Sequence, residues 1–210
     1  MTIGSNFPAD RPRGYATIET ETRRVRKALG AGPDEMLPGL RLFESLERYA
    51  VYIGETRVRL TYLISDLPRG VEARALYLQA SEEIALALSP ESYEGLEQEK
   101  PRPRFSLAHE IGHAVLHPKV LYRLATIPEE RAALARGDFG TLRPFQDVEW
   151  QANAFAAALL VPADGLEVLS NRGRLSADVV ARTFGVSSEC ARIRVSVFKE
   201  RRTHLLSPKK

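Results

Sequence analysis

The run His109-Glu110-Ile111-Gly112-His113 has the residue types and the spacing of a metal site. Four residues make slightly more than one turn of an α-helix, so both imidazoles leave the same face and can bind one ion. Glu110 lies beside them, where a carboxylate can act as a general base. Gly112 on the same stripe leaves room for a second backbone to approach. The pattern predicts a catalytic zinc site rather than two surface histidines on an amphipathic helix.

Two histidines leave a catalytic zinc site one protein ligand short, and His117 is one candidate for the third position. It lies two helical turns from His109 and is rotated by about 80° around the helix axis, which disfavours a shared ion. Pro118 follows at once. We therefore expect His117 to end the helix, to offset its negative pole, and at most to contact a liganding histidine.

Glu149 is the predicted third ligand, on a helix expected over residues 146–160. Small residues such as Ala152 share its face, and opposite Gly112 they would let the two helices pack closely. Asn153, one turn after Glu149, is expected to form a hydrogen bond to a liganding histidine and to fix its ring. The competing carboxylates lack such a small-residue face; they are Glu129, Glu130, Asp138 and Asp147.

The elements that must position these residues divide the chain into a strand-rich first half and a helical second half. Alternating apolar residues predict strands over 58–64, 73–79 and 84–89, and the polar, proline-flanked stretch 90–103 predicts a loop. This order predicts an α+β fold, with a small antiparallel sheet packed on a helical core and a C-terminal helical subdomain. Helices are expected over 17–29, 40–49, 106–116, 129–136, 146–160, 163–170, 177–184 and 188–201.

The composition excludes several classes of protein. The chain has 210 residues, of which 44% are hydrophobic and 27% charged, which is ordinary globular usage and excludes extensive disorder. No apolar run approaches the roughly 20 residues that span a bilayer, and residues 1–10 lack the apolar core of a signal peptide. A single cysteine, Cys190, fits a reducing compartment, so we expect a cytoplasmic protein with no membrane contact. The net charge of +3 does not by itself indicate nucleic-acid binding.

Two segments of the chain resemble the ImmA/IrrE-type metallopeptidases. The run from Arg102 to His117 is similar to the active helix of that family, and the run from Glu149 to Pro162 is similar to its second helix. Residues 175–198 resemble the helical part that follows. The resemblance implies a gluzincin-like zinc peptidase in which the metal ligands are His109, His113 and Glu149, and the general base is Glu110.

The resemblance also implies a substrate. Studied members of the family act on helix-turn-helix transcriptional repressors, and so regulate transcription of mobile elements or stress responses. Many relatives carry an N-terminal DNA-binding domain, whereas at most 38 residues precede the second helix here, so we expect the repressor to be a separate protein. Gln151 and Ala158 stand where the family often has an acid, but neither is a predicted ligand.

Three points about the chemistry stay open at the level of sequence. Zinc is the metal expected for two histidines and a glutamate, and manganese or iron also suits these ligands. An additional donor to the developing oxyanion is expected from among His117, Tyr122 and several arginines. An exposed sheet edge beside the site would hold an extended substrate by strand addition.

We divide the chain into an N-terminal arm and first helix (1–38), a metallopeptidase domain (39–170) and a C-terminal helical segment (171–210). Residues 1–16, with prolines and glycines among charges, are expected to be a loose arm. The last segment has the outline of a helix-turn-helix, whose second helix carries Arg192 and Arg194. The alternative function is therefore a non-hydrolytic regulator that binds DNA or a repressor and uses the metal for structure. The intact Glu110 favours the peptidase.

Overall fold

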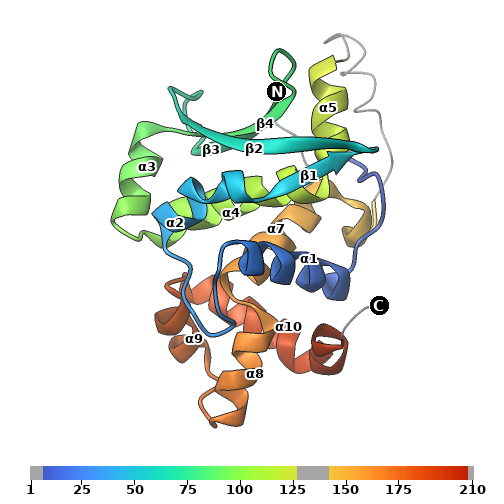
Figure 1. Ribbon diagram of the computed structural model, residues 1–210. Helices are drawn as coiled ribbons and strands as arrows, with labels where there is room; N and C mark the ends of the chain where they lie inside the picture. The colour runs from blue at the N-terminus through green and yellow to red at the C-terminus, as the bar shows by residue number, and fades with distance from the viewer. Residues whose placement is uncertain (1–6, 127–141, 208–210) are drawn as a thin grey trace.

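The computed structural model describes residues 7–126 and 142–207, and its layers are a sheet above a stack of helices (Figure 1). Directly beneath the sheet runs α4, the helix that carries the two spaced histidines, and α7 and α1 lie below it. The last three helices form the foot of the molecule. This arrangement confirms the predicted α+β class with C-terminal helices. The bounds are α1 Tyr15–Ala28, α4 Pro101–Leu116, α7 Val148–Leu160, α8 Ala163–Asn171, α9 Ala177–Phe184 and α10 Ser188–Leu206.

The sheet is mixed rather than wholly antiparallel, and its strand order is β1-β2-β4-β3. The β1–β2 and β3–β4 pairs are antiparallel, but β2 and β4 run parallel. The reason is that residues 65–72 carry the chain past the place of β4, so β3 becomes an edge strand and β4 returns into the gap. A central place suits the apolar sequence of β4. The strands are β1 Ala50–Ile53, β2 Thr56–Ile64, β3 Ala73–Leu78 and β4 Glu83–Leu88.

The expected loop over 90–103 is wrong, because this stretch contains α3 (Pro90–Glu97) and the first turn of α4. Pro90 and Pro101 are the first residues of these two helices, where the missing N–H has no partner to lose. The side chain of Ser89 caps α3 by accepting a hydrogen bond from Ser92 N at 3.2 Å. In this stretch the prolines therefore mark the beginning of helices and not the flanks of a loop.

Other differences are local. The helix expected over 40–49 is a short α2 (Gly39–Glu44) followed by a 3-10 turn (Leu46–Arg48). Strand β1 and helix α5 (Pro118–Thr126) were not predicted. The helix expected over 129–136 lies outside the described residues.

The N-terminal arm is not loose where the structure describes it. Residues 7–13 run along the segment that leads into α7, with an isolated β-bridge between Pro8 and Asp147. Because these backbone groups pair with each other, an extended arm rich in proline is held without secondary structure of its own. The hydrogen bonds are Ala9 N to Gln146 O (2.8 Å), Arg13 N to Phe145 O (3.0 Å) and Val148 N to Phe7 O (3.1 Å).

Helix α10 is anchored by a buried ion pair between Arg194 and Glu19 of α1. Arg194 Nε also donates to Val161 O at 2.9 Å, and Glu19 accepts a hydrogen bond from Ala163 N at 3.2 Å. These contacts tie α10 to α1 and to the junction of α7 and α8. Arg194 is therefore a structural residue, and its buried side chain is not available to contact DNA.

Within residues 7–126 and 142–207, no single helix is long and apolar enough to cross a membrane. Helices α7 and α8 pass that test only as a pair, and the pair is bent by 44°.

Candidate metal centre

The centre forms where α4 packs against α7. Gly112 of α4 faces Ala152 and Phe155 of α7, and the missing side chain lets the two helices come close. Leu107 and Ile111, on the neighbouring positions of α4, are fully buried and fix the rotation of the helix. The local sequence thereby turns both histidines toward α7.

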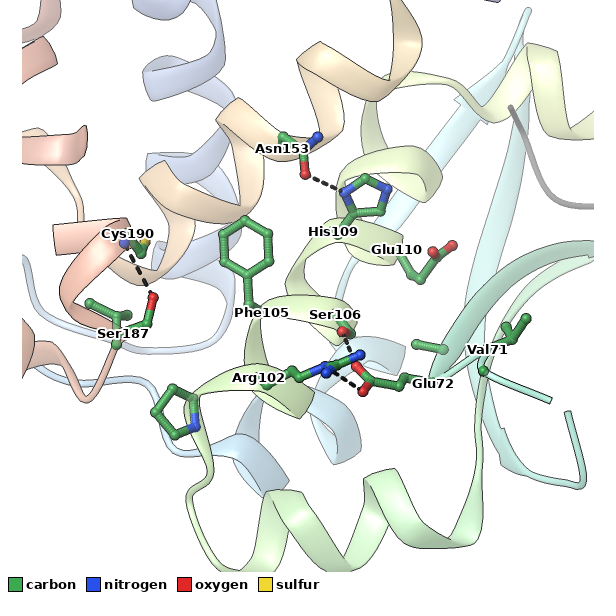
Figure 2. Close-up of a pocket in the computed structure, with 14 residues that line it drawn as sticks. Val71, Glu72, Arg102, Phe105, Ser106, His109, Glu110, Asn153, Ser187 and Cys190 are labelled. Atoms are coloured by element: carbon green, nitrogen blue, oxygen red, sulfur yellow. Dashed lines mark hydrogen bonds and ion pairs between the residues drawn. The ribbon is translucent and has the colours of Figure 1, made fainter. Parts of the chain in front are cut away.

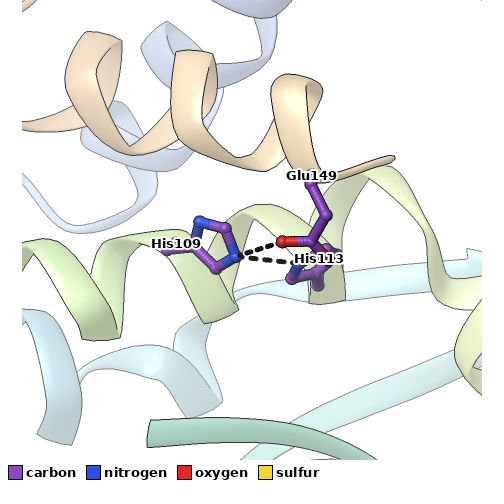
Figure 3. A group of neighbouring side chains, drawn as sticks. All are labelled: His109, His113 and Glu149. Atoms are coloured by element: carbon purple, nitrogen blue, oxygen red, sulfur yellow. Dashed lines mark hydrogen bonds and ion pairs between the residues drawn. The ribbon is translucent and has the colours of Figure 1, made fainter. Parts of the chain in front are cut away.

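Three potential ligand atoms converge between these helices (Figure 3). His109 Nε2 lies 3.0 Å from His113 Nε2 and 3.3 Å from Glu149 Oε2, and His113 Nε2 lies 3.4 Å from Glu149 Oε1. Donors about 2.05 Å from a tetrahedral zinc ion are separated by about 3.3 Å. The spacing of the three side chains therefore fits one small cation.

The hydrogen bonding around these atoms also fits a cation. Asn153 Oδ1 lies 3.0 Å from His109 Nδ1, so the oxygen accepts a hydrogen from that nitrogen, and in the neutral ring Nε2 keeps its lone pair. Glu149 Oε1 is buried and has no hydrogen-bond partner. A buried carboxylate oxygen without a donor is costly unless a positive charge faces it. Within the described residues, Glu149 Oε1 and the lone pair of His109 Nε2 are therefore both left to face a cation between the two helices.

The electrostatics of the cluster favour positive charge. Burial opposes ionisation of Glu149, but the adjacent His109 and His113 outweigh it and lower the pKa of this carboxyl to about 2. Burial likewise lowers the pKa of His109, yet the hydrogen bond to Glu149 and the charge of Glu110 raise it above its ordinary value. Glu149 is therefore ionised and draws a cation or a proton into the cluster.

Glu110 extends from α4 toward the sheet (Figure 2). Its Oε2 accepts a hydrogen bond from Ala75 N of the edge strand β3 at 2.7 Å. Burial raises the pKa of Glu110, while the two histidines and the Ala75 N–H lower it, and burial prevails. A raised pKa improves the ability of a carboxylate to hold a transferred proton.

His117 terminates α4 and is fully buried. Its Nδ1 lies 3.2 Å from His113 Nδ1, and its Nε2 lies 3.0 Å from Gln151 Oε1. Burial, reinforced by His113, lowers the pKa of His117 well below its ordinary value. The imidazole is therefore neutral, and the expectation that it offsets the negative pole of the helix is wrong. The structure places it behind His113 instead.

Gln151 was noted in the sequence only as a departure from a family pattern. It is fully buried and joins His117 to the N-terminal arm. The available signal was a glutamine inside an otherwise apolar, alanine-rich helix, because a buried amide needs partners.

The remaining candidates lie elsewhere. Asp147 caps α7 by accepting a hydrogen bond from Glu149 N at 3.1 Å, so its carboxylate is engaged with the helix. Tyr122 lies on α5, with its ring 5.1 Å from that of Tyr77. Glu129, Glu130 and Asp138 lie outside the described residues.

A cleft of about 710 Å³ opens beside His109 and Glu110 (Figure 2). One wall is the start of β3, the floor is the first turns of α4, and the far wall is the N-terminal end of α10. At the rim, Glu72 binds Arg102 Nε at 2.6 Å and accepts a hydrogen bond from Ser106 Oγ at 2.6 Å. An adjoining hollow of about 420 Å³ shares Phe105, Asn153, Ser187 and Cys190 with the cleft.

A helix bearing H-E-x-x-H beneath a sheet, with a glutamate presented by a second helix, is typical of metallopeptidase-type proteins. Comparison with protein families agrees: residues 96–196 match the IrrE N-terminal-like domain, Peptidase_M78. Residues 96–196 are therefore similar to the domain of the ImmA/IrrE-type family. The matched segment includes His109, Glu110, His113 and Glu149.

The chain is also similar to a solved structure described as a Mycobacterium tuberculosis transcriptional regulator, with a TM-score of 0.49 and 17% sequence identity. The similarity covers 85% of this chain and 46% of that one, so the match spans less than half the length of the regulator. Among curated proteins, no significant match was found.

Proposed function

We propose that this protein is a zinc-dependent endopeptidase that cleaves a helix-turn-helix transcriptional repressor supplied as a separate protein. One observation carries the catalytic part of the proposal. His109 Nε2, His113 Nε2 and the two oxygens of Glu149 meet at 3.0–3.4 Å, with Glu110 on the adjacent side of the same helix. The repressor as substrate rests on the similarity of residues 96–196 to the ImmA/IrrE-type family.

The residues divide the work as follows. His109, His113 and Glu149 would hold the ion, and Asn153 would keep the ring of His109 in place. When bound, zinc would lower the pKa of water to about 7 and polarise the peptide carbonyl. Glu110 would take the proton of the attacking water and pass it to the departing amine. Manganese or iron would occupy the same ligands.

The edge of β3 offers a place for the substrate backbone. Ala75 N–H points outward from the sheet, since it donates to Glu110 and not to β4. Ala73, two residues earlier, faces the same edge and lines the cleft. An extended peptide added along this edge would pass Glu110 and the ion.

Metal content measured on purified protein tests the ion site. After loading with zinc and dialysis, wild type is expected to retain about one zinc per chain, and Glu149→Gln to lose most of it. Glu97→Gln, which removes an exposed carboxylate at the end of α3, is the matched control. Equal zinc retention in all three proteins would show that Glu149 is not a ligand.

Peptidase activity is tested by mass spectrometry of newly formed peptide N-termini in a cell extract. The extract is incubated with wild type or with Glu110→Gln, in which the ligands are intact. New termini inside helix-turn-helix repressors, present with wild type and reduced at least about 100-fold with Glu110→Gln, are expected. Zinc retained without any new terminus would favour the non-hydrolytic regulator. New termini found only in other proteins would support the peptidase activity but contradict the proposal that a repressor is the substrate.

We also propose a role for each of the three parts of the chain. Residues 39–170 would form the metallopeptidase domain, and residues 171–210 would grip the protein substrate through the wall that α10 adds to the cleft. Residues 1–38 would support the metal centre from behind.

A further inference from the structure

A buried series of hydrogen bonds leads from the N-terminal arm to the back of His113. Arg13 Nη1 donates to Gln151 Oε1 at 3.2 Å. The same oxygen lies 3.0 Å from His117 Nε2, and His117 Nδ1 lies 3.2 Å from His113 Nδ1. Arg13, Gln151, His117 and His113 are all buried, so water does not compete for these contacts.

The direction of the series is fixed at Gln151. Its Nε2 donates to two backbone oxygens, Arg11 O at 3.1 Å and Phe145 O at 2.9 Å. Rotation of the amide by 180° would place its oxygen against these two carbonyls and its NH2 group against the guanidinium of Arg13. The oxygen of Gln151 must therefore face His117 and Arg13.

That orientation determines where each imidazole carries its hydrogen. Gln151 Oε1 has no hydrogen to give, so His117 Nε2 is the donor between them. His117 is fully buried and shares this oxygen with a cationic guanidinium, so it is a neutral imidazole with a lone pair on Nδ1. His113 Nδ1 must then donate to that lone pair. His113 Nε2 is left without a hydrogen, 3.0 Å from His109 Nε2.

We infer that Gln151 is a positioning residue, which selects the tautomer of His113 able to bind a metal through Nε2. The N-terminal arm belongs to the same device, since Arg11 O and Arg13 hold the amide on both sides. The inference rests on the proposed metal-binding role of His113. It gives the arm and the buried glutamine a function that the three ligands alone do not require.

Nitrogen-15 NMR of the imidazoles in the metal-free protein tests the tautomers directly. The chain has four histidines, so signals can be assigned by substitution. Wild type is expected to show hydrogen on Nδ1 of His113 and on Nε2 of His117. Hydrogen on Nε2 and none on Nδ1 of His113 in wild type would overturn the inference.

Gln151→Met keeps the side-chain length and removes both the acceptor and the donor. The expected result is a mixture of tautomers at His113, an unchanged Nδ1–H at His109, and a zinc affinity lowered by about 10-fold. Thr22→Val is the control, since it removes a different buried polar group, the hydroxyl that donates to Glu19 O. It should change neither readout.

The outcomes separate this inference from the proposed function. An unchanged His113 tautomer and unchanged zinc affinity in a folded Gln151→Met protein would overturn the positioning role while leaving the metal site. If wild type shows the expected tautomers but retains no zinc, the proposed function fails and the hydrogen-bond series still stands.

Discussion

Gly112 of α4 lies directly against the backbone of Ala152 of α7: a Cβ placed on Gly112 would be 3.2 Å from both Cα and O of Ala152. That is closer than ordinary van der Waals contact, and a helix backbone cannot move aside as a flexible side chain can. The distance between the helix with the two histidines and the helix with Glu149 therefore depends on this absent side chain.

Gly112→Ala is expected to lower the free energy of unfolding by about 1–3 kcal/mol, because the added methyl forces α4 and α7 apart. The same displacement should weaken zinc retention, since Glu149 moves with α7. Denaturant unfolding and metal content measure the two effects. Gly14→Ala is the control: nothing lies within 4 Å of a Cβ at Gly14. A stable Gly112→Ala protein with normal zinc would show that the contact tolerates a methyl.

Asn153→Ala removes the acceptor at His109 Nδ1. Without it the ring of His109 is free to rotate and to carry its hydrogen on Nε2, so zinc affinity should fall by about 10-fold to 100-fold. Competition with a chromophoric chelator measures the affinity. Since Asn153 is exposed, the free energy of unfolding should stay close to that of wild type. A change in stability with intact zinc affinity would contradict this role.

Arg194→Met is expected to lower the free energy of unfolding by about 3–5 kcal/mol, because it leaves Glu19 buried without its cation. Denaturant unfolding is the measurement. Arg192→Met is the matched control on the same helix: Arg192 is exposed and pairs with the exposed Glu189 at 2.8 Å, so no loss is expected. Equal stability of the two variants would mean that the buried pair does not anchor α10.

Cys190 should react slowly with iodoacetamide in the folded protein. Burial raises the pKa of its thiol to about 11, although Arg194 and Arg104 oppose the shift. A raised pKa disfavours the reactive thiolate, so at pH 8.5 alkylation of the folded chain should be about 100-fold slower than of the denatured chain. The rate should still rise with pH above 9. Cys190→Ser gives the background, and equal rates in folded and denatured protein would contradict the prediction.

Much of the fold is readable because its signals are local. The alternation in β2 and the apolar spacing in α1 each lie within one element, and Ser176 and Ser187 cap the helices α9 and α10 that directly follow them. The order of the strands in the sheet, by contrast, depends on contacts between residues that are distant in sequence. Whether residues 65–72 form a turn or carry the chain past a strand depends on what β4 packs against, and the pattern of the strands is the same in both cases.

For the site, too, the features that can be predicted from the sequence are those that depend on local contacts. The spacing of His109 and His113 is a property of one helix, and the small residues around Glu149 indicate that its helix can approach another. The place of Gln151 cannot be obtained in this way. Its partners, Arg11 and Phe145, meet it only because the arm lies along the start of α7. His117 was misinterpreted for the same reason, since its neutrality comes from burial against residues distant in sequence.

The pairing of the N-terminal arm with the start of α7 has a consequence for biosynthesis. Arg13 and Gln151 are in contact across 138 positions of the chain. A nascent polypeptide that has emerged only as far as α5 carries both histidines and the general base, but it lacks Glu149 and the glutamine that orders His113. Helix α7 must therefore be synthesised before the N-terminal arm can form these contacts, so the metal centre assembles late in synthesis.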